Sequence, residues 1–317
     1  MSEAFVEVPF EVQKPQDGQR LDAYLAARLQ RYSRAEVQKL ISAGRVFLRG
    51  RAAKSSARVA AGETVLIRYP QRDEPASDHA ALPVIFESDR LLAINKPGGV
   101  LSHPTDKTLK NAATTILRAQ FPDLKLHLLH RLDRETSGVL MFAKDPRTAR
   151  SLGAAFFARE TAKVYLAIAQ GRVAWDEMEL DIPLDRQGGE IRVRQKAGKG
   201  QPALTVFERL AASDRGSLVL ARPKTGRLHQ IRVHLAHLGH PIVGDKLYIG
   251  DGEVYMKAVR RELEDSDLES LGAKRQMLHA LSLSFPDPER PERAITVEAP
   301  PPQDFMDTLK GLEIEWP

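Results

Sequence analysis

A polar stretch from Tyr69 to Leu82 divides the chain into two parts whose sequence patterns differ. It contains two prolines and three acidic residues, and its few apolar residues do not recur at helix or strand spacing, which is typical of a linker. A chain of 317 residues has room for one large domain and a small one. We therefore expect a small domain at residues 16–72, a linker at 73–83 and a large domain at 84–317.

The small domain has the pattern of two helices followed by strands. Leu21, Leu25 and Leu29 recur at four-residue spacing and mark one face of the first helix. Ser33 and Glu36 fit a capping box at the start of the second helix, in which each side chain binds the backbone N–H of the other residue. The further elements expected here are a helix end at Gly44, a strand at 46–48, a turn at 49–50 and a strand at 64–69.

Basic residues are concentrated in this small domain. The window from Gly18 to Arg72 holds twelve Arg and Lys against three acidic residues, a net charge of +9, although the whole chain carries only +5. A solvated basic face is the alternative interpretation, but charge segregated to this degree is typical of a surface that contacts a phosphate backbone. The candidate nucleic-acid contacts are Arg34, Lys39, Arg45, Arg49 and Arg51.

Short apolar runs of strand length alternate with modest helical patterns in the large domain. This spacing indicates an α+β fold whose mixed sheet is largely antiparallel. The expected strands are 91–95, 139–143, 164–169, 204–209, 218–221 and 281–285, and the expected helices are 112–120 and 148–157.

The segment from Asp251 to Glu269 is acidic, with seven acidic against three basic residues. An exposed helix or a flexible insertion is the expected structure. Its charge predicts that it faces away from a nucleic acid.

Composition excludes several classes of protein. The chain has no cysteine, so disulfides and thiolate metal sites are excluded. Residues 1–10 carry acidic residues and lack the basic and apolar regions of a signal peptide. No stretch approaches the roughly 20 apolar residues of a membrane span. We expect a cytoplasmic protein that does not enter a membrane.

The strongest chemical signal lies in residues 130–140, HRLDRETSGVL. Asp133 lies between Arg131 and Arg134, and flanking cations favour the ionised carboxylate. Exposed ion pairs contribute little to stability, so the arrangement indicates a carboxylate prepared for chemistry beside an anionic substrate. An N-capping or salt-bridged aspartate is the alternative for Asp133 taken alone.

This segment resembles the signature of the RluA-type pseudouridine synthases, which isomerise uridine in RNA. The reaction breaks the bond between nitrogen and sugar, turns the base and reattaches it through carbon-5, so one carboxylate and no metal or organic cofactor can serve. The resemblance implies that Asp133 is essential, that Arg131 enters the helical stack vacated by the flipped base, and that His130 binds substrate. Whether Asp133 attacks the sugar, attacks the base or removes a sugar proton stays open.

A second block, residues 223–234, PKTGRLHQIRVH, resembles a later motif of the same family. The matching positions make Arg232 the partner of the catalytic carboxylate, because a guanidinium fork suits a carboxylate, and they make Arg227 a phosphate contact. Leu228 stands where the family usually has a hydroxyl residue. A basic strand that contacts phosphate is the other interpretation of this block.

Two further blocks match the family in order. In residues 163–167, KVYLA, the resemblance places Tyr165 on the target base, where a ring can stack on uracil. A strand tyrosine packed in the core is the alternative. In residues 95–104, NKPGGVLSHP, Lys96 is assigned to substrate binding or to support of the fold.

The helix pair and basic hairpin of the small domain resemble the S-four-like RNA-binding module of a small-subunit ribosomal protein. Arg49 stands where that module often has Asn. The pairing with a synthase domain resembles the RluC- and RluD-type members, which implies ribosomal RNA or a pre-ribosomal particle as partner, with transfer RNA as the alternative substrate. We expect a monomer without organic cofactor or metal.

Three other functions fit parts of the sequence. A two-carboxylate glycosidase would pair Asp133 with Glu135 or Asp145, but like charges beside arginines do not set up an acid and a base with separated pKa values. A non-catalytic RNA-binding protein would leave the blocks around Asp133 without a purpose. A metal hydrolase would use histidines, but there is no HExxH pattern among the four that cluster in sequence, His229, His234, His237 and His240.

Overall fold

The computed structural model describes residues 5–29, 32–70, 77, 79–105, 108–191, 193–260 and 262–317. The chain forms two compact units, residues 1–75 and 76–317. Residues 73–76 and 78 of the predicted linker lie outside the described residues.

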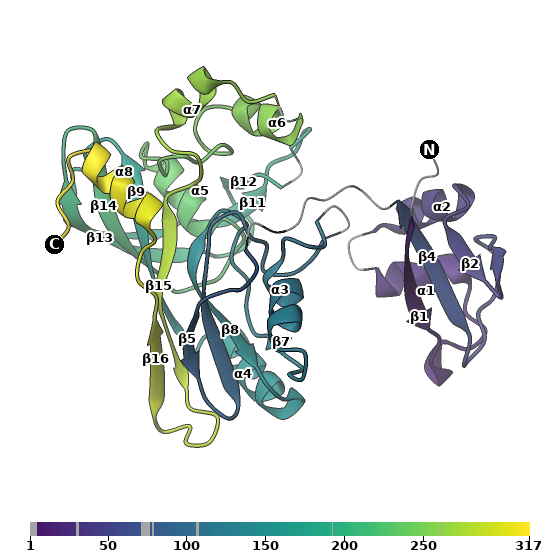
Figure 1. Ribbon diagram of the computed structural model, residues 1–317. Coiled ribbons are helices and arrows are strands. Elements are labelled where there is room, and N and C mark those ends of the chain that lie inside the picture. The colour runs from purple at the N-terminus through teal and green to yellow at the C-terminus, as the bar shows by residue number, and fades with distance from the viewer. Residues whose placement is uncertain are drawn as a thin grey trace. The chain divides into compact units, whose positions relative to one another are not determined.

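The first unit is a four-stranded antiparallel sheet with two α-helices (Figure 1). Its strand order is β1-β4-β2-β3. The elements are β1 Phe5–Glu11, a 3-10 turn Lys14–Gln16, α1 Leu21–Arg28, α2 Arg34–Ser42, β2 Val46–Leu48, β3 Arg51–Ala52 and β4 Thr64–Pro70. β1, which was not expected, pairs with β4 along its whole length.

Local sequence signals account for both helices of this unit. Leu21 and Leu25 of α1 are fully buried. The predicted capping box is confirmed: the backbone N–H of Ser33 donates to Glu36 at 2.8 Å, and that of Glu36 donates to Ser33 Oγ at 3.3 Å. Gly44, just beyond α2, has φ of 68°, a conformation that glycine adopts without strain.

Asp22, in the first turn of α1, is a fully buried carboxylate. It accepts hydrogen bonds from Arg20, Arg34 and Gln38 at 2.9 to 3.2 Å. The Arg20 hydrogen bond, with help from Gln38 and Arg34, outweighs the effect of burial and holds the pKa of Asp22 well below its ordinary value. Asp22 therefore ties the start of α1 to α2.

Asp22→Asn is expected to destabilise this unit by about 1–2 kcal/mol at pH 7, because the amide lacks the negative charge with which two guanidinium groups pair. The folded-state pKa is depressed, so the contribution is present above the unfolded pKa of about 3.9 and is lost as pH falls toward the folded value. Urea unfolding of wild type and variant at pH 7 and pH 3 measures it. The difference should shrink at pH 3, and an equal difference at both values would contradict this role.

The predicted basic surface is partly used in internal ion pairs. Arg34 pairs with Asp22, and Arg49 pairs with Glu63. Three other candidates make no side-chain hydrogen bond or ion pair within the part of the chain that the structure describes: Lys39, Arg45 and Arg51.

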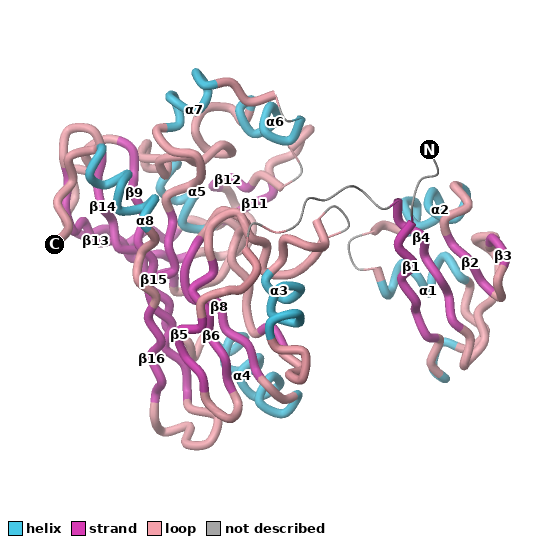
Figure 2. Tube along the Cα trace, viewed as in Figure 1, coloured by secondary structure: helices cyan, strands magenta, loops and turns pink. Residues whose placement is uncertain are grey.

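The second unit is built on a ten-stranded sheet (Figures 1 and 2). The main path is β10-β13-β14-β9-β15-β8-β6-β5, and β15/β8 is the one parallel pair in it. The strands are β5 Val84–Glu87, β6 Leu91–Lys96, β7 His127–Leu128, β8 Ser137–Ala143, β9 Ala162–Gln170, β10 Glu177–Asp181, β13 Leu204–Ala212, β14 Gly216–Pro223, β15 Leu278–Pro286 and β16 Ala294–Glu298, with a separate hairpin of β11 Leu184–Arg186 and β12 Gln195–Ala197. The expected mixed, largely antiparallel sheet is confirmed.

Six helices belong to this unit in the described ranges: α3 Ala113–Gln120, α4 Pro146–Ala158, α5 Gln230–His237, α6 Glu253–Arg260, α7 Asp265–Leu271 and α8 Gln303–Gly311. Among the described residues, none of the helices has the length and apolar character that crossing a bilayer requires. The acidic segment forms α6 and α7, which lie next to each other in Figure 1. An ion pair at 2.9 Å joins Lys257 to Asp267 between them.

Gly138 allows the single parallel crossing of the sheet. It has φ of 112°, and a Cβ there would lie 2.2 Å from the carbonyl oxygen of Ala280 on β15. Only glycine permits both the conformation and this approach. The glycine of the TSG sequence therefore fixes where β8 meets β15, directly after the loop that carries Asp133.

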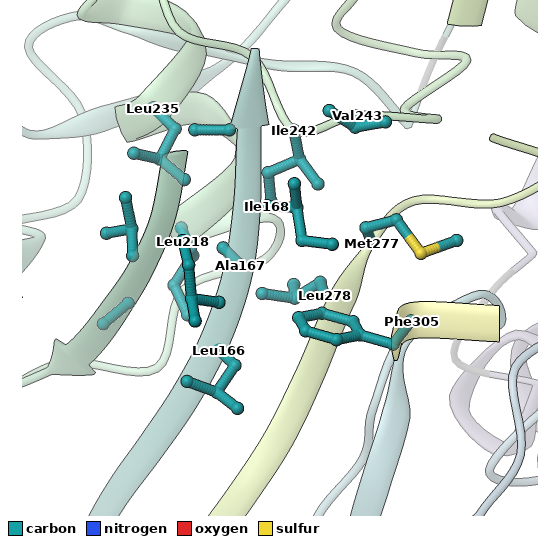
Figure 3. Packing of buried hydrophobic residues seen from close by; sticks show 14 of the residues in the cluster. Leu166, Ala167, Ile168, Leu218, Leu235, Ile242, Val243, Met277, Leu278 and Phe305 are labelled. Carbon is teal, nitrogen blue, oxygen red and sulfur yellow. The ribbon is translucent and has the colours of Figure 1, made fainter. Parts of the chain in front are cut away.

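The largest core cluster lies beside the strands that carry the candidate site. Figure 3 shows Leu166 and Ile168 of β9 packed with Leu218 of β14, Leu278 of β15 and Phe305 of α8. Leu235 of α5 belongs to the same cluster. Burial of these apolar groups holds α5 against β13 and β14, and so positions the side chains at the start of α5.

Candidate active site

A cavity of about 120 Å³ opens where the loop before β8, strand β9 and the start of α5 meet. Pockets for drug-sized ligands start at about 300 Å³, so this one is suited to a single small ring. The residues that line it include Arg131, Asp133, Lys163, Tyr165, Arg227, His229 and Arg232.

Asp133 and Arg232 meet in this cavity although they are far apart in sequence. Arg232 Nη1 donates to Asp133 Oδ2 at 2.8 Å. The other side of the guanidinium is held by Asp245, with Nε donating to Oδ2 at 2.7 Å and Nη2 donating to Oδ1 at 2.8 Å. Arg232 is only 7% exposed, so the two carboxylates fix its direction as well as balance its charge.

The surroundings of Asp133 keep it ionised. Burial by itself would raise the pKa of this carboxyl, but His229 and Arg232 oppose that effect, and the pKa lies below its ordinary value. Burial would lower the pKa of the Arg232 guanidinium, yet Asp245 and Asp133 raise it overall. Among the described residues, no group hydrogen-bonds to Asp133 Oδ1, which leaves that oxygen for a substrate.

Tyr165 has features of both predicted alternatives, because it packs in the core and also faces the candidate site. It lies on β9, packs against two of the core clusters and also lines the cavity. Burial, followed by the charge of Asp133, raises the pKa of its phenol. The ring is therefore uncharged at neutral pH and is held rigidly beside Asp133.

Comparison with known proteins identifies the family. The family model for RNA pseudouridylate synthase matches residues 90–237, and the model for the S4 domain matches residues 19–65. A Neisseria meningitidis serogroup A protein named ribosomal large subunit pseudouridine synthase D is 33% identical, and the alignment covers 94% of this chain and 80% of that protein. The chain belongs to the RNA pseudouridylate synthase family. It is an enzyme that isomerises uridine in RNA, and the resemblance seen in its motifs is confirmed.

Other relatives belong to the same family. The Yersinia pestis protein named ribosomal large subunit pseudouridine synthase C is 34% identical over 93% of this chain and 92% of its own. The solved structure of human RNA pseudouridylate synthase domain containing 4 has a TM-score of 0.59 at 26% identity, covering 74% of this chain and 94% of that one. The S4 domain and the family together make RNA the binding partner of the enzyme.

Two residues predicted to bind substrate have other positions. Lys96 is fully buried, and its Nζ donates to the carbonyl oxygens of Pro97, Val100 and Arg134 at 2.8 to 3.2 Å. Burial first, then the charge of Arg275, lowers its pKa to about 7. These contacts fit the expected support of the fold, because the side chain ties two loops together, and a contact of Lys96 with substrate stays a prediction.

His130 also lies outside the cavity lining. Its Nε2 accepts the backbone N–H of Met141 at 3.3 Å, and its ring stacks on Phe156 at 5.3 Å. Burial lowers its pKa to about 3. In this position His130 supports the loop that carries Asp133, and it does not line the cavity where the substrate contact was predicted.

The two remaining predicted arginines lie at the cavity. Arg131 is exposed and lines it. Arg227 lines it too, and its Nε donates to the carbonyl of Pro202 at 3.1 Å. The alternative of a basic strand for this block is wrong for its second half, because residues 230–237 form the helix α5.

Sequence reasoning missed Asp245, His229 and Tyr248 as parts of this site. No spacing in the sequence relates Asp245 to Arg232. His229 was considered only as a metal ligand. Within the described ranges no group of three or more His, Cys, Asp or Glu side chains could hold a metal ion, and His234 instead bonds Thr205 at 2.9 Å and the carbonyl of Ile182 at 3.0 Å.

Proposed function

We propose that this enzyme converts uridine to pseudouridine in large-subunit ribosomal RNA, with Asp133 as its essential carboxylate. The observation that carries the site assignment is the ionised Asp133 held by Arg232 in a cavity of single-ring size. The substrate assignment rests on relatives whose names state ribosomal large subunit pseudouridine synthase.

In this proposal three residues have different roles in catalysis: Asp133, Tyr165 and Arg232. Asp133 acts on the nucleoside when the glycosidic bond breaks, Arg232 keeps its carboxylate ionised and aimed, and Tyr165 stacks on the uracil while the ring turns. The reaction ends when C5 bonds to the sugar, the C5 proton leaves and N1 takes a proton, so no atoms are gained or lost. Arg131 and Arg227 contact the RNA around the flipped nucleotide.

In this proposal the small domain increases the affinity for RNA and positions the RNA on the enzyme. Its candidate contacts are the three basic side chains without internal partners in the described residues, together with the half-exposed Arg34. We further propose that the enzyme acts as a monomer and works in the cytoplasm, where ribosomal RNA is found.

The substrate is tested with purified enzyme and two RNA pools, protein-free large-subunit ribosomal RNA and bulk transfer RNA, neither carrying pseudouridine. We expect pseudouridine at one or a few positions of the ribosomal RNA, read by chemical mapping. Modification of transfer RNA alone would contradict the substrate assignment and leave the enzyme class intact.

Removal of residues 1–72 is expected to weaken RNA binding and to flatten its salt dependence, because each lost phosphate contact reduces the slope of log affinity against log salt by about 0.7–0.9. Binding of the two proteins to one RNA at several salt concentrations measures both effects. Equal affinity and equal slope would contradict a binding role for this domain. Residual activity at high RNA concentration would indicate that the second unit carries the chemistry.

A further inference from the structure

His229 faces the catalytic carboxylate from the start of α5. Its Nε2 lies 3.8 Å from Asp133 Oδ2, and its ring lines the cavity. The residue has φ of 56°, in the left-handed region that side chains other than glycine rarely adopt. This backbone conformation places an imidazole within reach of both Asp133 and any ring in the cavity.

The opposite nitrogen of His229 meets Tyr248. Nδ1 lies 2.9 Å from the Tyr248 hydroxyl oxygen. That oxygen also accepts the backbone N–H of Gln195 at 3.0 Å. Tyr248 is 7% exposed, and its ring stacks against the Arg232 guanidinium at 5.0 Å, so the hydroxyl is held in place.

These contacts fix the direction of the hydroxyl proton. Gln195 is a donor, so it cannot receive this proton. Within the described residues, His229 Nδ1 is the one acceptor that the Tyr248 hydroxyl contacts. If Nδ1 carried a proton instead, the buried phenol proton would have no partner, which folded proteins avoid. Tyr248 therefore donates to Nδ1, and a neutral imidazole must then carry its proton on Nε2.

The imidazole is neutral under ordinary conditions. Burial first, and the charge of Arg232 second, lower the pKa of His229 to about 4 against the opposing effects of Asp133 and Asp245. At neutral pH the ring then offers one N–H and one lone pair, and the lone pair is engaged by Tyr248.

We infer that Tyr248 holds His229 as the Nε2–H tautomer, so that His229 directs this N–H into the cavity beside Asp133, donates a hydrogen bond to a carbonyl oxygen of the uracil and does not remove the C5 proton. The part concerning uracil rests on the proposed function of the cavity. Tyr248 is then a positioning residue that acts through His229. A ring with carbonyl acceptors fits this donor, whereas a base role needs a lone pair on Nε2.

The tautomer can be measured without any activity assay. The full chain is labelled with ¹⁵N-histidine, and long-range ¹H–¹⁵N spectra are recorded at pH 7, with the His229 signals assigned by their loss in His229→Gln. We expect a protonated Nε2 and an unprotonated Nδ1, and a shift toward a tautomer mixture in Tyr248→Phe. A protonated Nδ1 in the wild-type enzyme would overturn the inference, even if Tyr248→Phe fails to fold.

A pair of amide variants tests the donor role in catalysis. The glutamine amide can present an N–H near the position of Nε2, whereas the shorter asparagine amide reaches only the position of Nδ1. We expect His229→Gln to keep kcat within about tenfold of wild type and His229→Asn to lose on the order of 10²-fold, the usual effect of removing one such donor. Asparagine tolerates the left-handed backbone better, so strain cannot produce this order.

A base role predicts a different pattern, because neither amide can accept the C5 proton, and both variants would lose activity equally. That equal loss would overturn the inference. His237→Gln, an exposed position on the same helix, is the matched control and should leave kcat unchanged. Failure of the proposed site would appear separately, as activity that survives Asp133→Asn while the histidine spectrum stays as expected.

Discussion

Asp133→Asn is expected to lower single-turnover pseudouridine formation by about 10³-fold or more, with little change in RNA affinity. Asparagine has the same shape but can neither attack carbon nor accept a proton, and removal of such a group commonly costs several powers of ten in kcat. Rapid-quench assays at saturating RNA, with pseudouridine counted by tritium release from C5-labelled uridine, measure the rate. Filter binding of the same RNA measures the affinity.

A matched control separates loss of chemistry from loss of structure. Asp214→Asn changes an aspartate whose side chain is 99% exposed and should behave as wild type. The melting temperature of Asp133→Asn should stay near that of wild type or rise, because the variant removes a buried charge while Arg232 keeps Asp245. A rate within tenfold of wild type would exclude Asp133 as the catalytic carboxylate.

Asp245→Asn is expected to lower kcat by about 10–100-fold and leave KM nearly unchanged. Asp245 holds two of the three guanidinium nitrogens of Arg232 that are hydrogen-bonded. A neutral amide binds that fork less well, Arg232 turns toward Asp133, and small displacements of catalytic groups cost up to about 10²-fold. Steady-state kinetics on one RNA substrate give the two constants.

The choice of control matters here as well. Asp267→Asn breaks an ion pair with Lys257 in the acidic segment, away from the cavity lining, and should leave kcat unchanged. A double variant of Asp245→Asn with Asp133→Asn should be no slower than Asp133→Asn alone, because both act on one group. Wild-type kcat in Asp245→Asn would show that Asp133 and the remaining contacts hold Arg232 without it.

The fold was predictable where the signal is local. Spacing of Leu21 and Leu25 gave α1, Ser33 and Glu36 gave the start of α2, and apolar runs gave six strands of the large sheet. Strands such as β1 and β5 were missed because their hydrogen bonds depend on partners elsewhere in the chain. The parallel pairing at Gly138 could not be predicted for the same reason, because the need for glycine there comes from the close approach of Ala280 on another strand.

The residues of the candidate site that lie in family motifs could be predicted from the sequence. Asp133, Tyr165 and Arg232 were named from their blocks, and the structure brings all three to one cavity. Asp245 and Tyr248 follow α5 in a loop and contact Arg232 and His229 through tertiary packing, and no periodicity connects them to α5. Both alternatives stayed open for Lys96, because sequence does not tell a buried ammonium from one that binds phosphate.

The most direct test of the central claim is pseudouridine mapping of large-subunit ribosomal RNA from cells that lack this gene, complemented with wild type or with Asp133→Asn. We expect one or a few positions to lose pseudouridine in the deletion strain, to regain it with the wild-type gene, and to stay unmodified with the variant produced at the same level. An unchanged ribosomal RNA map in the deletion strain would contradict the substrate, and restoration by Asp133→Asn would contradict the catalytic assignment.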